Sequence, residues 1–432
     1  LSIQQRNQHL PRQISMLVSP QAQKLQLDYV RSHFPSLQND WIFMDNAGGS
    51  QIARPVLERI QDYLVNSNVQ LGASYAVSQE ASDRVRQGDK AAALLMNAAD
   101  PSEVVMGAST SLLLRILAIC LSQTWEAGDE VIVTDCDHEA NITPWLELQQ
   151  KGIVVKFWRI NPETLTFHLE DLAPLMTDKT RLVALTHASN VLGTINPIRA
   201  IAQFVHDHGA LMCVDGVGYA PHRLINVQAL DVDFYVYSFY KVYGPHHAVL
   251  YGKRDHLLKM PGFNHDFIPQ DMIPYKFQPG GANYELSYSI TGLTHYFESL
   301  ARHHMGDRLG YDPRAQLEQA FELIAVYEEQ LSDRLLSYLT SKPKVRIIGN
   351  PKGDRHQRVP TIAFVKDGTD SASIPAQLDS HHIGIRYGDF YAKRLINSLH
   401  LQPCNGVVRV SMVHYNTLEE VDRLIEQLEP LL

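Results

Sequence analysis

Short apolar segments alternate with amphipathic ones between about residues 100 and 255. Strands are predicted at 103–106, 130–134, 153–158, 181–187, 210–215, 233–238 and 248–252, and helices at 110–123, 142–151, 168–176 and 197–208. The strands are nearly continuous apolar runs, which is typical of strands buried on both faces. Their alternation with helices predicts an α/β fold, with a mostly parallel seven-stranded sheet covered by helices on both sides.

The pattern changes after Arg314. A long amphipathic helix is predicted over 314–341, and it is followed by short strands at 345–349, 361–365, 384–388 and 407–413 and by a closing helix from residue 418. This order is typical of a smaller α+β domain. We therefore predict an N-terminal segment (1–40) that packs on the small domain, a large domain (41–310) and a small C-terminal domain (311–432).

The composition is that of a globular protein of 432 residues, with 45% hydrophobic residues, 20% charged residues and a net charge of −9. An acidic balance without clustered Lys and Arg argues against nucleic-acid binding, and no apolar run reaches the ~20 residues of a membrane span. The first residues are polar and unlike a secretory signal, and Met16 is a candidate natural start. Four scattered cysteines suit a reducing cytoplasm, where we expect the protein to be located.

In open α/β sheets, ligands bind at the carboxyl ends of the strands, so polar residues directly after each apolar run are candidates for a site. The segment 107–111 (GASTS) ends one strand and opens a helix, where N–H groups and hydroxyls can hold an anion. Ser and Thr are also ordinary helix caps. Asp215 ends another strand, where a carboxylate can pair with a cationic ring nitrogen, cap a helix or bind a metal.

Two further side chains follow apolar strands. Lys241 lies between the strand 233–238 and a turn, where burial favours the neutral amine that forms imines, although most lysines at strand ends lie on the surface. His138 follows the strand 130–134 and can stack on a flat ligand, although a structural role is more common for a single histidine. Together these four features are the parts of a pyridoxal 5′-phosphate (PLP) site. The sequence thus predicts a PLP enzyme that acts on an amino acid.

The motifs and their order resemble the class V aminotransferases of PLP fold type I, most closely the cysteine desulfurase and selenocysteine lyase branch. The similar stretches run from Phe43 to the end and include FMDNAGGSQ, VVMGASTS, CDHEANITPW, HASNVLGTINPI, VDGVGYAPHR, YSFYKVYGPHHAVLYG, FQPGGANYE, GIRYGDFYAKRL and VVRVSMVHYN. The resemblance implies fold type I and a homodimer. The segment that contains Gly280 and Gly281 is similar to one that reaches the phosphate in the neighbouring subunit.

The resemblance also implies cofactor roles. Lys241 would hold PLP as a Schiff base, Asp215 would keep the pyridine nitrogen protonated, and His138 would stack on the ring. The residues implied to bind the phosphate are Ser109, Thr110, Ser238 and Gly281.

On the substrate side, the resemblance implies three roles. Asn190 would lie near the ring oxygen and the substrate, Arg409 would bind the substrate carboxylate, and Arg386 would be a second arginine at the start of the active-site loop. Tyr391, in the same loop, is expected to close the pocket or to donate a proton to a leaving group.

The loop departs from the family pattern at Tyr391. Desulfurases of this branch read R-x-G-H-H-C-A, whereas residues 386–392 read RYGDFYA, and a phenol cannot carry persulfide sulfur. Cys404 is not expected to replace the missing thiol. Gly218 and Tyr240 stand where the family has glutamine and histidine, and Tyr219, Tyr240 or water could offset the lost glutamine.

The expected chemistry begins with removal of the α-proton of an L-amino acid by Lys241. A C–S lyase-type β-elimination without a persulfide cysteine is our first expectation, and transamination is the second. Epimerisation, persulfide-forming desulfuration and a catalytically weak PLP-binding regulatory or partner-binding protein stay open. Histidine pairs at 246–247, 303–304 and 381–382 point in different directions, so no metal is predicted.

Overall fold

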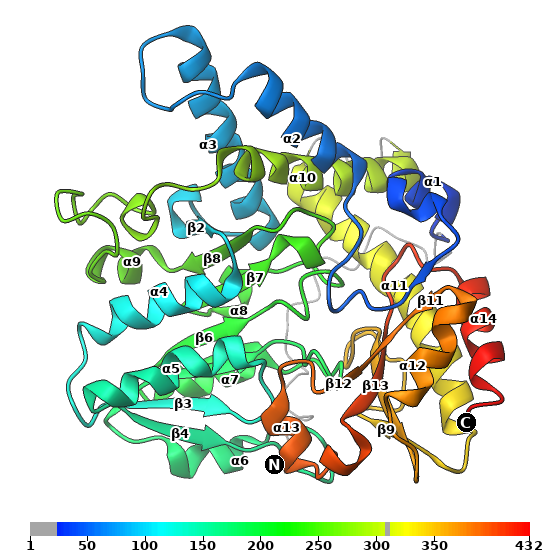
Figure 1. The fold of residues 1–432 in the computed structure, drawn as a ribbon. Helices are drawn as coiled ribbons and strands as arrows, with labels where there is room; N and C mark the ends of the chain where they lie inside the picture. The colour runs from blue at the N-terminus through cyan, green and yellow to red at the C-terminus, as the bar shows by residue number, and fades with distance from the viewer. Residues whose placement is uncertain (1–23, 307–311) are drawn as a thin grey trace.

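The computed structural model describes residues 24–306 and 312–432 (Figure 1). Met16 and the predicted domain boundary near residue 310 lie outside the described residues. The large sheet has the strand order β2-β8-β7-β6-β5-β3-β4, and only β8 runs against its neighbours. The strands are β2 (Val104–Gly107), β3 (Glu130–Thr134), β4 (Val154–Trp158), β5 (Thr180–Thr186), β6 (Leu211–Asp215), β7 (Phe234–Ser238) and β8 (Ala248–Gly252). The prediction of a mostly parallel seven-stranded sheet is confirmed.

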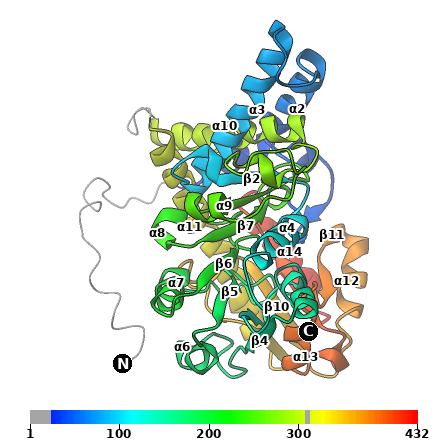
Figure 2. The same cartoon turned by 90° about the vertical axis from the view of Figure 1, so that its left-hand side faces the viewer.

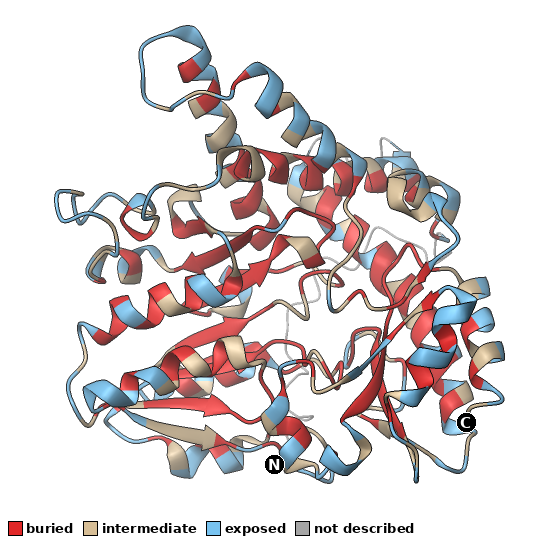
Figure 3. Cartoon of the chain, in the orientation of Figure 1, coloured by how far each residue is buried: buried red, intermediate tan, exposed pale blue. Residues whose placement is uncertain are grey.

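Side chains on the two faces of this sheet belong to different parts of the core. Cys213 and Val236 pack in a cluster with α4 (Thr110–Ser122) and α5 (Thr143–Glu147). Val214 and Tyr235 are their neighbours on the same two strands, and their side chains pack in a second cluster with α7 (Ile198–Asp207). Figure 2 shows α4 and α7 on opposite sides of the sheet, and Figure 3 shows the strands mostly buried, except for β4 at the edge, which is largely of intermediate exposure. Burial on both faces explains why the strands are apolar throughout.

Three long helices, which were not predicted from the sequence, form a layer beyond β2. They are α2 (Arg54–Asn66), α3 (Ala76–Met96) and α10 (Tyr284–Met305), and Figure 1 shows them above the sheet. At Gly88 a Cβ atom would lie 2.0 Å from the Ser287 carbonyl oxygen, so glycine is needed for the close approach of α3 and α10. Across 24–306 and 312–432, none of the helices combines the length and the hydropathy that crossing a bilayer requires.

A smaller antiparallel sheet with the order β12-β13-β10-β9 lies beside the large one. Its strands are β9 (Val345–Ile348), β10 (Thr361–Lys366), β12 (Arg386–Gly388) and β13 (Val407–Ser411), and a parallel pair joins β1 (Ile42–Phe43) to β11 (Ile383–Gly384). The accompanying helices are α11 (Pro313–Thr340), α12 (Ser373–Leu378), α13 (Lys393–Ser398) and α14 (Leu418–Leu428). α11 begins where the Asp312 carboxylate accepts hydrogen bonds from the Arg314 and Ala315 N–H groups.

Two predicted helices are shorter than expected. The segment 142–151 forms α5 and then a 3₁₀ turn, and 168–176 forms α6 (Leu169–Leu172) followed by a 3₁₀ turn that contains Pro174. Proline lacks the N–H group that a continuing α-helix needs, which explains the second change. The remaining short helices are α8 (Val227–Leu230) and α9 (Arg254–Lys259).

The N-terminal helix α1 (Leu27–Ser32) contacts two parts of the molecule. The Arg31 guanidinium pairs with Glu420 of α14 at 2.8 Å and donates to the Tyr415 carbonyl. The Gln26 N–H donates to the His304 imidazole of α10 at 2.9 Å. The described part of this segment therefore contacts α14 near the small sheet, and α10 as well.

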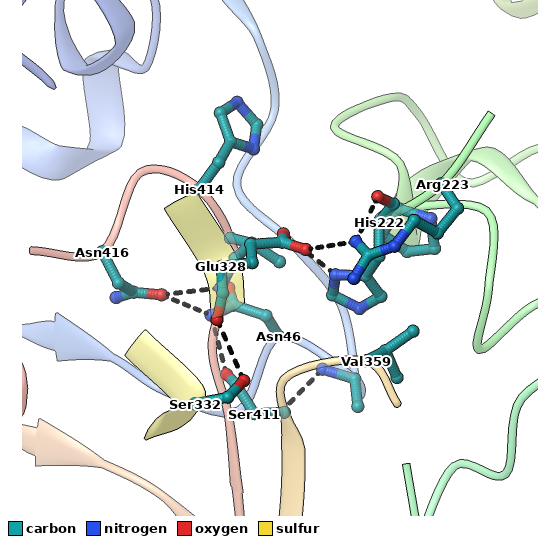
Figure 4. A network of polar contacts seen from close by, with 12 residues as sticks. Asn46, His222, Arg223, Glu328, Ser332, Val359, Ser411, His414 and Asn416 are labelled. Atoms are coloured by element: carbon teal, nitrogen blue, oxygen red, sulfur yellow. Dashed lines mark hydrogen bonds and ion pairs between the residues drawn. The ribbon is translucent and has the colours of Figure 1, made fainter. Parts of the chain in front are cut away.

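Buried polar contacts join α11 to the loop after β6, and the segment after β1 to β13 (Figure 4). Glu328 of α11 is fully buried, and its carboxylate lies 3.0 Å from the His222 imidazole and 3.1 Å from the Arg223 guanidinium in the loop after β6. The Asn46 amide donates to the Ser411 carbonyl (2.9 Å) and to Asn416 (3.2 Å). These contacts fix the segment after β1 against β13, and that segment carries a residue of the site described below.

Candidate active site

One cavity at the carboxyl ends of β3, β5, β6 and β7 contains all residues predicted to bind PLP except Gly281. Its lining residues are Ser109, Thr110, Ser111, His138, Ala140, Thr186, Ala188, Asn190, Asp215, Val217, Gly218, Ser238, Tyr240 and Lys241. Parallel strands bring their carboxyl ends to one edge, which explains why residues up to 132 positions apart meet here.

Hydroxyl groups and a helix N-terminus form one end of the cavity. Ser109 caps α4 by accepting a hydrogen bond from the Leu112 N–H at 3.2 Å, and Thr110 Oγ1 lies 2.6 Å from Ser238 Oγ at the end of β7. Thr110 and Ser238 are both buried. Convergent hydroxyls at the positive end of a 13-residue helix fit a phosphate group.

Lys241 and Asp215 lie buried in the centre of the cavity. Lys241 ends a 3₁₀ turn directly after β7, and burial together with the charge of Arg409 lowers the pKa of its amine to about 8. Burial raises the pKa of Asp215 to about 6, while a hydrogen bond from the Val217 N–H and the charge of Lys241 oppose that rise. A cationic ring nitrogen beside Asp215 would favour its carboxylate form.

His138 follows β3, and a hydrogen bond fixes the tautomer of its neutral ring. Its Nδ1 accepts a hydrogen bond from the Ala140 N–H at 3.0 Å, so a proton on the neutral ring sits at Nε2. Burial and the charges of Lys241 and Arg409 lower the pKa of His138 to about 4, which keeps the imidazole neutral at pH 7. A neutral, half-buried ring in the cavity wall suits stacking on a flat cofactor.

A second buried carboxyl group, Asp137, was not identified from the sequence. It accepts hydrogen bonds from the Asn141 amide at 2.7 Å and from the Thr134 hydroxyl, and burial together with Asp215 raises its pKa to about 7. Its contacts fix the turn that carries His138. The only sequence signal was its place next to His138 at the end of an apolar strand.

Gly218 and Tyr240, the two departures from the family pattern near the ring site, have different surroundings. At Gly218 a Cβ atom would lie 2.4 Å from the Ala188 carbonyl oxygen, so the main chain there leaves no room for a side chain. Tyr219 stacks on the buried His187 ring at 3.6 Å and does not line the cavity, so it is not placed to replace the glutamine. Tyr240 does line the cavity, where its ring stacks on His246 at 5.0 Å.

The predicted substrate arginines lie opposite each other on β12 and β13. Arg409 is 2% exposed, and its Nη2 pairs with Asp45 Oδ1 at 2.8 Å while its Nη1 donates to the Asn190 carbonyl at 3.0 Å. Arg386 is 57% exposed and approaches Asp45 Oδ2 at 3.5 Å. The Asp45 carboxylate between the two arginines was not expected from the sequence. The Asn190 amide, in turn, donates to the Phe390 carbonyl.

The loop that carries Tyr391 folds back onto the site. The Tyr391 carbonyl accepts a hydrogen bond from the Glu139 N–H at 2.8 Å, and Arg394 pairs with the Glu139 carboxylate at 2.9 Å. The Tyr391 ring is 70% exposed, with its centre 5.2 Å from that of His138. The phenol therefore lies at the mouth of the cavity rather than inside it.

Gly281 lies outside the cavity, next to a separate hollow that Gly107, Ala108, His246 and Asn283 help to line. Gly280 and Gly281 both have left-handed backbone conformations, with φ of 78° and 85°. Their predicted contact with a phosphate in a neighbouring subunit stays a prediction.

Comparison with known proteins identifies the family. The family model "Aminotransferase class-V" matches residues 42–306 and 315–424. The chain belongs to the class V aminotransferase family. It is 44% identical to the "Aminotransferase-like protein FGM3" of Gibberella zeae (94% of this chain, 98% of the relative) and 32% identical to the "Cysteine desulfurase-like protein ustD" of Aspergillus flavus (96% and 92%). The crystal structure of the cysteine desulfurase CsdA from Escherichia coli superposes with a TM-score of 0.79 at 26% identity, covering 94% of this chain and 98% of that one.

Members of this family are PLP-dependent enzymes, and the residues of this chain fit that cofactor. The hydroxyl-lined helix N-terminus suits the phosphate, the buried Asp215 suits a protonated pyridine nitrogen, and the buried Lys241 suits the aldehyde. The predictions of PLP as cofactor, of enzyme class and of fold type I are confirmed.

Proposed function

We propose that this class V family member removes the α-proton of an L-amino acid and then expels a β-substituent, as a C–S lyase does, without forming a persulfide on the enzyme. The observation that carries the proposal is the placement of the Lys241 amine. It is buried in the PLP-type cavity beside Asp215, and the charge of Arg409 helps to lower its pKa to about 8. An amine with that pKa is partly neutral near pH 7 to 8 and can accept a proton.

The arrangement of thiols argues against persulfide chemistry. All four cysteines are among the described residues, and none lines the cavity. Burial raises the pKa values of the Cys120, Cys136 and Cys213 thiols, which disfavours the reactive thiolate. Cys404 lies in a 3₁₀ turn before β13, and the loop position expected to carry a nucleophile holds Tyr391.

Each of the other site residues has a separate role in the proposed reaction. PLP, when bound, supplies an electron sink that acidifies the α-proton of an amino acid. Asp215 holds a proton at the pyridine nitrogen, Lys241 Nζ takes the α-proton, and Arg409 orients the substrate through its carboxylate. Tyr391, whose exposed ring lies 5.2 Å from that of His138, is the residue that we propose contacts the leaving group.

Transamination is the second candidate. The relative with 44% identity over almost the whole chain is called aminotransferase-like, and transamination needs the same lysine, aspartate and arginine. It differs from elimination in its outcome, because the β-substituent would stay on the released keto acid and an acceptor would have to take the amino group.

The deciding experiment is a screen of the purified holoenzyme against L-amino acids. Three outcomes are measured separately. They are pyruvate with sulfide, pyruvate with another leaving group, and a keto acid whose formation requires an amino acceptor. Pyruvate released without an acceptor supports β-elimination, whereas acceptor-dependent keto-acid formation supports transamination. A Lys241→Ala preparation is the control, because it keeps the cavity but lacks the base.

We further propose that the chain works as a homodimer. Leu112 and Ile119 of α4 are 44% and 39% exposed, and Leu112 lines the hollow beside Gly281 together with Leu286. A second copy covering this region would place both chains beside the phosphate end of the cavity. Sedimentation of the holoenzyme at micromolar concentration tests this, and a monomer with full PLP content contradicts it.

A further inference from the structure

We propose that Asp45 occupies the place of the substrate carboxylate on Arg409 and so sets how tightly substrates bind. The inference rests on the proposed function, because it assigns Arg409 to the substrate. It goes further by naming Asp45 as the residue that the substrate must displace and Arg386 as the residue that receives it.

One N–H donor of the Arg409 guanidinium has no acceptor among the described residues. Asp45 Oδ1 accepts from Nη2 at 2.8 Å, and the Asn190 carbonyl accepts from Nη1 at 3.0 Å. The Nε atom is buried and, among the residues that the structure describes, has no hydrogen-bond partner. Nε and Nη2 lie on the same edge of the guanidinium, where a carboxylate can accept from both at once. A ligand carboxylate on that edge would accept hydrogen bonds from both Nε and Nη2, whereas Asp45 accepts only from Nη2.

Arg386 is a second ion-pair partner of Asp45. Its Oδ2 lies 3.5 Å from Arg386 Nη1, on a side chain that is 57% exposed. Backbone hydrogen bonds fix the main chain on both sides, from the Ser411 N–H to the Met44 carbonyl (2.7 Å) and from the Asn46 N–H to the Ser411 carbonyl (3.2 Å). A rotation of the Asp45 side chain therefore suffices to move its charge from Arg409 to Arg386. The exchange keeps every charge paired while a ligand enters.

The loop residue Phe390 covers the same guanidinium. Its ring centre lies 3.7 Å from the Arg409 guanidinium carbon, and its carbonyl accepts a hydrogen bond from the Asn190 amide at 2.8 Å. Phe390 and Tyr391 have φ angles of 53° and 59°, a left-handed conformation that is costly for residues with a side chain. Phe390 thus covers the face of the guanidinium from a costly turn and leaves the edge with Nε and Nη2 to a carboxylate.

The test uses propionate, a carboxylate without an amine, and measures its binding to the holoenzyme by calorimetry. Asp45→Asn keeps the side-chain shape but removes the competing charge, so we expect propionate to bind about tenfold more tightly than to the unmodified protein. Asp40→Asn is the matched control, because it removes the same charge from an exposed residue five positions earlier and should leave the affinity unchanged. Equal or weaker binding in a folded Asp45→Asn protein overturns the proposal.

A second variant covers the case in which loss of the Arg409 partner prevents folding. Arg386→Leu removes the exposed residue that receives Asp45, so propionate binding should weaken about threefold relative to Arg159→Leu, which removes an equal charge from a more exposed side chain. If Asp45→Asn folds, the two arginine changes can be added to it separately. Arg386→Leu should then lower the propionate affinity no more than Arg159→Leu does. No difference between the two single arginine variants overturns the proposal. Propionate binding needs no turnover, so the test stands even if the proposed reaction proves wrong.

Discussion

The two halves of the active site are built in different ways. The cofactor half (Ser109, Thr110, His138, Asp215, Ser238 and Lys241) lies at the ends of neighbouring strands of one buried sheet. The substrate half (Asp45, Arg386, Phe390 and Arg409) joins segments 364 positions apart through ion pairs and a strained loop. The first half is held by the core, whereas the second is held by polar contacts that, under our proposal, a ligand replaces. We therefore expect substitutions in the first half to abolish chemistry and substitutions in the second half to change substrate binding.

The largest effect is expected for Lys241→Ala. Without the base, turnover of the best substrate should fall by about 10³-fold or more, because a positioned acid–base group contributes 10²–10⁴-fold. The hydroxyl-lined helix N-terminus should still retain part of the PLP, which dialysis followed by phosphate and absorbance analysis can measure. Turnover within tenfold of the unmodified enzyme would show that another group is the base.

Arg409→Ala should chiefly raise KM, by about 10- to 100-fold, with a smaller change in kcat, because it removes a contact made in both the ground and transition states. Arg358→Ala is the matched control, since Arg358 is also buried but donates to the Asn350 and Thr361 carbonyls, away from the cavity. Both variants should lower Tm, but only the first should change KM. A fall in kcat at constant KM would place Arg409 in the cofactor half.

The lowered pKa of Lys241 predicts a pH dependence for covalent attachment of PLP to the apoenzyme. A depressed amine pKa means that the reactive neutral form accumulates as the pH rises through about 8 and is nearly complete a unit above it. The attachment rate, followed by absorbance, should therefore rise about tenfold from pH 7 and then level off. A rate that still climbs at pH 10 would show that Lys241 titrates as an ordinary exposed lysine.

The smallest effect is expected from removing every thiol. A variant in which Cys120, Cys136, Cys213 and Cys404 are all replaced should keep its PLP spectrum and most of its turnover. The three buried positions need small apolar replacements to preserve packing, and differential scanning calorimetry checks that they do. If activity disappears and a variant that keeps Cys404 alone restores it, the chain is a desulfurase after all.

The difference between the halves also decides what the sequence could predict. Lys241, Asp215 and His138 each follow an apolar strand, so a local pattern identified them and parallel strands brought them together. Asp137 stood beside His138 and was overlooked. The partnership of Asp45 with Arg409 has no local signal, because the segment after β1 meets β13 only in the folded chain, through a bridge between Asp45 and Ser411. The helices α2, α3 and α10 were not predicted from the sequence; α10 packs on α2 and α3, which are distant from it in the chain, and on α11.

Gly218 limits how this protein can change over time or in the laboratory. The carbonyl of Ala188 lies where the first side-chain atom of any other residue would sit, at 2.4 Å. A designer who wants to restore the glutamine of related desulfurases therefore cannot do so with one codon. The turn around Ala188 must be rebuilt first, and only then can a larger residue be accepted at position 218. Any larger residue at position 218 therefore requires a change of main chain as well as a change of side chain.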